Sequence, residues 1–165
     1  MGVSHDYFRA VDAPAAVRVM DQPGGPAGRG SPWDALDGRG VDPHVVLARL
    51  VAIARGAEGR SRLLDATPVW PAGACPEHWE DLPADSPWVT GPWIEELDPA
   101  VRDALADVDN ARLPDLAARW ARIEEFQPPY GAVDEAALQA FLERLVQLAR
   151  RARDAGERLY CWSCL

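Results

Sequence analysis

Lysine is absent from this sequence of 165 residues, and all 17 basic residues are arginines. The 26 acidic residues outnumber them, so the formal net charge is -9. A chain of this charge repels nucleic acids and anionic membranes unless basic side chains gather on one face. No basic cluster is visible, and residues 63–101 hold eight acidic residues and no arginine. We therefore expect neither nucleic acid nor a membrane among the partners.

Long hydrophobic runs are also missing. The longest apolar-rich stretch, VVLARLVAIA, is interrupted by Arg49 and is shorter than the roughly 20 apolar residues that cross a bilayer. The segment MGVSHDYFRA has no basic region followed by an apolar run, so it does not resemble a secretory signal. The expected location is the cytoplasm, where cysteines remain thiols or bind metals more often than they form disulfides.

Common catalytic motifs are absent as well. The sequence contains no G-x-S-x-G, H-E-x-x-H, P-loop or G-x-G-x-x-G pattern. The glycine-rich segment QPGGPAGRGSP (22–32) lacks the Lys-Ser/Thr pair of a phosphate-binding loop and is expected to be a flexible connector. These absences disfavour the common hydrolases and nucleotide-binding enzymes.

The composition is that of a globular protein, with 48% hydrophobic and 26% charged residues. The length suits a single domain (1–165) with an ordinary hydrophobic core. Residues rich in β-favouring side chains predict a strand near each end, VSHDYFRAV (3–11) and RLYCW (158–162). The predicted fold class is α+β, with these terminal strands in a small sheet packed by four to five helices.

Aspartates that can cap a first turn mark the predicted helices. They are Asp12, Asp42, Asp98 and Asp134. The Asp42 helix is expected to begin at Pro43, and another helix is expected over LPDLAARWARIEEF (113–126). In the last helix the apolar residues recur at three- and four-residue steps, which predicts one buried face. That face comprises Leu138, Phe141, Leu142, Leu145, Leu148, Ala149 and Ala152.

The middle segment, residues 65–93, holds six prolines and four of the seven tryptophans. Prolines at this density argue against a helix and leave short strands or an ordered loop. Large aromatic rings seek burial, so the loop is expected to be ordered. It is either a loop held to the domain by its aromatic side chains or a wall over a binding pocket. The candidate binding residues are Trp70, Trp79, Trp88 and Trp93.

Cysteine and histidine spacing suggests one metal site. Cys75 and His78 form a C-x-x-H pair, and Cys161 and Cys164 form a C-x-x-C pair. Three thiolates and one imidazole are a common ligand set for structural zinc, which would join the middle loop to the last strand. The alternative is that the cysteines are free thiols, because Cys is often a small buried apolar residue. In one continuous strand Cys161 and Cys164 would point to opposite faces.

Acid–base candidates are few. His5 and Asp6 are neighbours in the first predicted strand and should face opposite sides of the sheet. His44 is expected on the surface in a first helical turn, and His78 lies in the acidic sequence EHWED. Any of His5, Asp6 or His78 could serve as an acid or base in a pocket under the middle loop.

Both ends of the chain are similar to a known family. MGVSHDYF followed by a helix, and a long helix leading into GERLYCW, resemble the YfbM-like family of small bacterial proteins of unknown function. The segment LDPAVRDALADVD also suits that pattern. The resemblance implies an α+β fold, and the family has no established activity to transfer.

Two functions from different classes are compatible with these observations. The first is a non-catalytic binding or interaction module that uses its acidic, tryptophan-rich loop to contact a protein partner or a small molecule. The alternative is a small-molecule enzyme with an acid–base pocket under residues 65–93.

Overall fold

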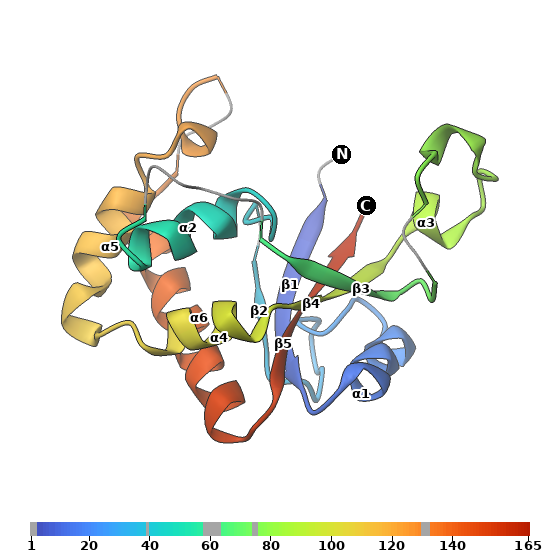
Figure 1. The fold of residues 1–165 in the computed structure, drawn as a ribbon, viewed down its shortest axis with the longest axis horizontal. Coiled ribbons are helices and arrows are strands. Elements are labelled where there is room, and N and C mark those ends of the chain that lie inside the picture. Colours follow the sequence, from blue (N-terminus) through green and yellow to red (C-terminus); the bar gives the residue numbers. More distant parts are fainter. Residues whose placement is uncertain (1–2, 39, 58–63, 74–75, 130–132) are drawn as a thin grey trace.

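The computed structural model describes residues 3–38, 40–57, 64–73, 76–129 and 133–165. Five strands form one antiparallel sheet in the order β2-β1-β5-β4-β3 (Figure 1). They are β1 (Ser4–Ala10), β2 (Ala35–Asp37), β3 (Ala66–Trp70), β4 (Trp93–Leu97) and β5 (Arg158–Cys164). The terminal strands β1 and β5 pair in the middle of the sheet, with Ser4 opposite Cys164 and Ala10 opposite Arg158. The predicted α+β fold with both terminal strands in the sheet is confirmed.

Helices cover both faces of the sheet, and one further short helix, the third along the chain, projects away from it (Figure 1). They are α1 (Ala13–Val17), α2 (Val46–Ala54), α3 (Pro87–Thr90), α4 (Pro99–Ala106), α5 (Leu113–Trp120) and α6 (Glu135–Asp154). Short 3-10 turns are η1 (Arg18–Asp21), η3 (Trp79–Asp81), η4 (Asn110–Arg112) and η5 (Glu124–Phe126). Helices α2, α4, α5 and α6 pack on one face, and α1 with η1 packs on the other (Figure 1).

Three of the predicted aspartate caps are present as expected. Asp12, Asp98 and Asp134 each accept a hydrogen bond from a backbone N–H in the first turn of α1, α4 and α6. The buried face of α6 is also confirmed: six of its seven predicted residues are buried, and Phe141 is half-buried. Gly56 and Gly156 follow α2 and α6 with positive φ angles, a conformation that other residues rarely adopt.

Other helix boundaries differ from the prediction. The Asp42 carboxylate accepts hydrogen bonds from the N–H groups of His44, Val45 and Val46. These bonds hold residues 43–45 in a turn, so α2 begins at Val46, not at Pro43. Helix α5 ends at Trp120, six residues before the expected end.

The prediction that prolines exclude a helix from the middle segment is wrong for one turn. Helix α3 begins at Pro87, where a helix tolerates proline because no N–H is needed. The Ser86 side chain caps it by accepting from the N–H of Trp88. Strand β3 occupies part of the same segment, and residues 76–92 form an arm that projects from the sheet between β3 and β4 (Figure 1).

Side-chain alternation along β5 separates two hydrophobic cores. Leu159 and Cys161 belong to the core under α2, α4, α5 and α6. Tyr160 and Trp162 belong to the smaller core beside α1. Residues 22–32 contain no helix or strand and run against this smaller core. There Gly25 has positive φ, and a Cβ on it would come within 3.0 Å of the Trp162 ring.

No helix among the described residues has the length and apolar character needed to cross a membrane.

Candidate functional site

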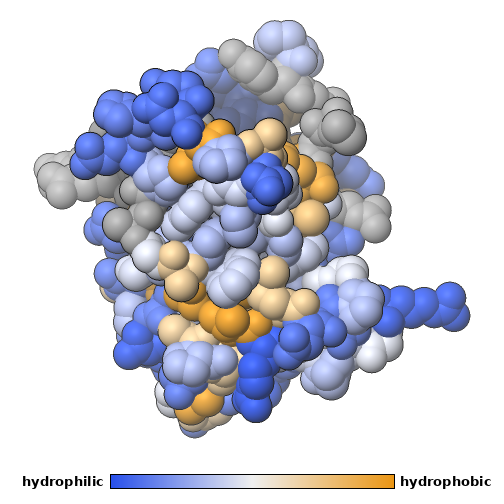
Figure 2. All heavy atoms as spheres, turned by 90° about the vertical axis from the view of Figure 1, so that its right-hand side faces the viewer, coloured by the Kyte–Doolittle hydropathy of each residue, from blue (hydrophilic) through white to orange (hydrophobic). Residues whose placement is uncertain are grey.

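A cavity of about 480 Å³ lies where β1 begins, β5 ends and the arm joins β3 and β4. We call it the tryptophan pocket. Its apolar lining consists of Val3, Pro43, Pro68, Trp70, Trp88 and Trp93. Its polar lining consists of His5, Asp42, His44, Glu95 and Ser163. Figure 2 views the molecule from the side of the arm, where pale and orange residues fill most of the middle of the face and strongly hydrophilic residues surround them.

Strand register brings two of the polar residues together beside Trp93. His5 of β1 lies opposite Ser163 of β5, and Ser163 in turn lies opposite Trp93 at the start of β4. His5 Nδ1 and Ser163 Oγ share a hydrogen bond of 2.9 Å. Ser163 is buried in the strand, so its hydroxyl has a fixed place at the floor of the pocket.

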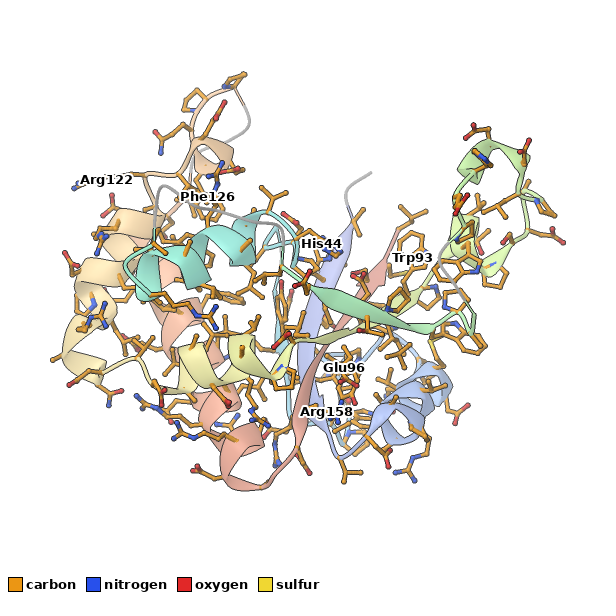
Figure 3. All side chains as sticks on the ribbon, in the orientation of Figure 1. His44, Trp93, Glu96, Arg122, Phe126 and Arg158 are labelled. Carbon is orange, nitrogen blue, oxygen red and sulfur yellow. The ribbon has the colours of Figure 1, made fainter. Side chains whose placement is uncertain are left out.

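His44 enters from the turn before α2. The Asp42 carboxylate holds this turn, and His44 Nε2 lies 3.0 Å from Glu95 Oε2. Figure 3 shows His44 beside the start of α2 and Trp93 at the base of the arm, on either side of the ends of β1 and β5. His44 is a surface residue as expected, with 43% of its side chain exposed, but it lies in the turn before α2 and its ring pairs with a carboxylate on the sheet.

The two histidines of the pocket have pKa values shifted in opposite directions. Burial lowers the pKa of His5, because a partly dehydrated site disfavours the charged imidazolium, although Asp42 and Glu95 oppose this effect. The hydrogen bond that His44 donates to Glu95 raises the pKa of His44, and the Leu64 carbonyl acts in the same direction. The shifts differ in sign because His44 pairs with the Glu95 carboxylate, whereas His5 shares its hydrogen bond with the neutral hydroxyl of Ser163.

Three of the four candidate tryptophans line the pocket. Trp70 ends β3 and Trp93 begins β4, so the sheet itself positions both. Trp93 Nε1 donates a 2.9 Å hydrogen bond to the Trp88 carbonyl, which ties α3 of the arm to the sheet. The side chain of Trp79 lies outside the described residues. The binding role of these tryptophans stays a prediction.

The three proposed acid–base residues are separated. Only His5 lines the tryptophan pocket. Asp6 points to the other face, where it accepts a hydrogen bond from the Ala27 N–H. His78 is exposed on the arm and is not part of the pocket lining. Sequence reasoning missed Glu95 and Ser163, and neither stands in a motif that would have marked it.

The terminal cysteines occupy opposite faces of β5. Cys161 is fully buried in the core under the large helices, and burial raises the pKa of its thiol. Cys164 is partly exposed and packs against the smaller core. Both are free in this arrangement, and the described residues include no group of three or more His, Cys, Asp or Glu side chains placed to hold a metal. Cys75 lies outside the described residues, so the zinc site stays a prediction.

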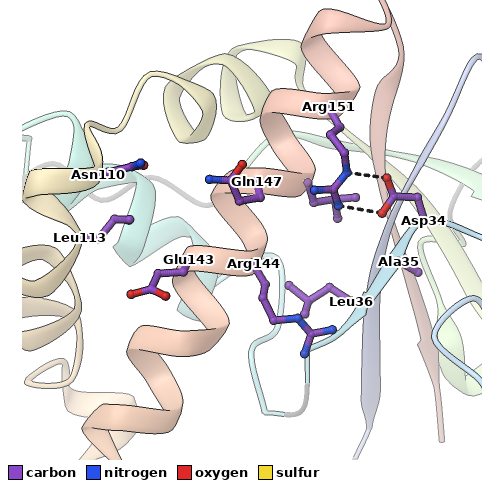
Figure 4. Close-up of a pocket in the computed structure, with 10 residues that line it drawn as sticks. Asp34, Ala35, Leu36, Asn110, Leu113, Glu143, Arg144, Gln147 and Arg151 are labelled. Atoms are coloured by element: carbon purple, nitrogen blue, oxygen red, sulfur yellow. Dashed lines mark hydrogen bonds and ion pairs between the residues drawn. The ribbon is translucent and has the colours of Figure 1, made fainter.

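A larger and more polar cavity, about 770 Å³, lies between α6, η4 and β2 (Figure 4). Arg151 donates two hydrogen bonds to the carboxylate of Asp34, at 2.7 and 2.8 Å. Arg9 donates a third to the same carboxylate. These contacts link α6 to the segment before β2, so we assign this cluster a structural role.

No family model, curated protein or solved structure that we compared with this chain is similar to it. Function therefore has to be argued from the chemistry of the site.

Proposed function

We propose that this protein binds a small organic molecule in the tryptophan pocket. The observation that carries the proposal is the convergence of Trp70, Trp88 and Trp93 with two histidines and Glu95 around one cavity. Ligand pockets typically combine mainly apolar and aromatic walls with a few fixed polar groups, and volumes of roughly 300–1,000 Å³ are usual. The hydrogen bonds of His5, His44 and Trp93 fix the geometry of this pocket before a ligand binds.

The indole N–H resonances of isotope-labelled protein provide the test. A fragment library is screened by NMR, and each hit is mapped on the tryptophan signals. We expect hits to shift the signals of Trp70, Trp88 and Trp93 and to leave that of Trp120 unchanged, because Trp120 is fully buried in the helical core. Replacing Trp88 with Ala should weaken those hits. Hits that shift none of the three pocket signals would contradict the proposal.

A second candidate is a contact surface for a protein partner on the arm. Glu77, Glu80, Asp81 and Asp85 are exposed there, and the arm projects from the sheet (Figure 1). A basic partner would suit this charge. Binding of such a partner should be lost when the four acidic residues are replaced by Gln or Asn, and it should not require Trp93 or His44.

A further inference from the structure

We infer that the ligand of the tryptophan pocket is an organic cation of the quaternary or methylated ammonium type. This inference rests on the proposed function and specifies its ligand class. It follows from the combination of aromatic walls with carboxylates and from the absence of arginine in the lining.

The lining supplies aromatic faces and negative charge. Three indole rings line the cavity, and tryptophan attracts a cation over its ring face more strongly than any other side chain. Asp42 and Glu95 are the carboxylates of the lining. No arginine contributes to it, and β3, the arm and β4 contain none. An anionic ligand would meet two carboxylates here and no guanidinium.

The polar side chains lie on one part of the lining, and this distribution disfavours a ligand with many hydroxyl groups. The polar side chains belong to the ends of β1 and β5, to the turn before α2 and to β4, whereas the walls toward the arm are Pro68, Trp88 and Trp93. A ligand with hydroxyl groups on this side would need hydrogen-bond partners there, because a buried polar group left without one is unfavourable. A methylated ammonium group needs none, and its methyl groups suit an apolar wall.

The protonated ring of His44 would compete with such a ligand for the carboxylate of Glu95. As an imidazolium it pairs with Glu95, and the groups around it are Glu95 from β4, Asp42 from its own turn, His5 from β1 and the Leu64 carbonyl. A bound cation near Glu95 would repel the imidazolium and favour loss of its proton. Affinity for the cation should therefore rise as the pH increases through the pKa of His44.

The experiment compares choline with 3,3-dimethyl-1-butanol, in which a carbon replaces the charged nitrogen. Tetramethylammonium and benzoate are the further probes, and the titrations follow tryptophan fluorescence and the indole signals. We expect choline and tetramethylammonium to bind at least about tenfold more tightly than the neutral analogue, as a desolvated cation–π contact implies. Choline affinity should rise several-fold from about pH 6 to 8.5, while that of the neutral analogue should not change.

Adjacent glutamates provide a matched pair of variants. Glu95→Gln should reduce choline affinity by about tenfold and leave the neutral analogue unaffected. Glu96 is the next residue on β4 but faces the other side, where it accepts hydrogen bonds from Arg158 and Tyr160. Glu96→Gln should leave both affinities unchanged, and circular dichroism of both variants checks their folding.

The outcomes separate this inference from the proposed function. If the neutral analogue or benzoate binds in the pocket as tightly as choline, the cation inference is wrong and small-molecule binding stands. If no probe binds, the cation inference is also wrong, and the fragment screen decides small-molecule binding independently. Choline binding that survives Glu95→Gln unchanged would overturn the role given to this carboxylate.

Discussion

His44 Nε2 and Glu95 Oε2 lie 3.0 Å apart although 51 residues separate them in the chain. This contact joins the turn before α2 to β4 and closes one side of the tryptophan pocket. It also couples the protonation of His44 to folding, because the pKa of His44 is raised by its hydrogen bond with Glu95.

The first prediction concerns the pH dependence of stability. A histidine whose pKa is raised by folding contributes stability that is fully present below its unfolded pKa of about 6.5 and lost as the pH rises through the folded value. Glu95→Gln should therefore lower the free energy of unfolding more at about pH 5.5 than at about pH 8.5. Urea unfolding at both values measures the difference. Glu96→Gln is the control, since its partner Arg158 stays charged throughout, and an equal effect of Glu95→Gln at both pH values would contradict the prediction.

The sequence predicted the terminal strands and most helix caps, because these depend on local patterns. It also marked as candidates the three tryptophans that line the pocket. It did not place the strands β2, β3 and β4, although short strands were one option left open for residues 65–93. Strand β2 has only three residues, and β4 (Trp93–Leu97) follows Pro92 with adjacent glutamates that do not resemble an apolar strand. Both depend on pairing with β1 and β5, which a local pattern does not reveal.

The same limit applies to the site. His5 was named as a candidate from its residue type, but its neighbours Ser163 and Glu95 reach the pocket only through strand register. His44 was expected in a first helical turn, but its helix begins three residues later than the Asp-Pro start suggested, and its pairing with Glu95 has no local signal. The hydrogen bonds that the Asp42 carboxylate accepts from the N–H groups of residues 44–46 replace a helical turn there.

A second prediction concerns Asp34, whose pKa is lowered to about 2, first by the two hydrogen bonds from Arg151 and then by the one from Arg9. A carboxyl with a depressed pKa stabilises the fold above its unfolded pKa and loses this effect as the pH falls through the folded value. Asp34→Asn should lower the free energy of unfolding by about 1–2 kcal/mol at neutral pH. The loss should shrink between about pH 4 and pH 2. Denaturant unfolding across this range tests it.

Asp85→Asn is the matched control for Asp34, because Asp85 is exposed on the arm. It should change the free energy of unfolding by less than about 0.5 kcal/mol. Equal effects of the two variants would show that the arginine contacts of Asp34 contribute nothing to stability.

A third prediction concerns thiol reactivity. Cys164 is partly exposed whereas Cys161 is fully buried with a raised pKa, so N-ethylmaleimide should modify Cys164 first. Cys161 should react only through opening of the sheet, at least about 100-fold more slowly. Mass spectrometry of peptides after timed labelling distinguishes the two positions, and equal rates would contradict the burial of Cys161.

The same labelling experiment tests the zinc hypothesis. If Cys75, His78, Cys161 and Cys164 hold zinc, the purified protein should contain one equivalent of metal, and a chelator should accelerate labelling of both terminal cysteines. A chelator that changes neither rate, with no metal by elemental analysis, would rule this site out.

The last prediction concerns α6, which packs against α4, α5 and the sheet. Leu145 is 0% exposed in this core. Leu145→Ala should lower the free energy of unfolding by about 2–5 kcal/mol, because it removes buried apolar contacts and leaves a cavity among helices that can only partly close it. Leu165→Ala is the same chemical change at a residue that is 62% exposed, and it should cost less than about 0.5 kcal/mol. Denaturant unfolding of both variants provides the comparison. A loss below about 0.5 kcal/mol for Leu145→Ala would mean that this side chain does not lie in the core.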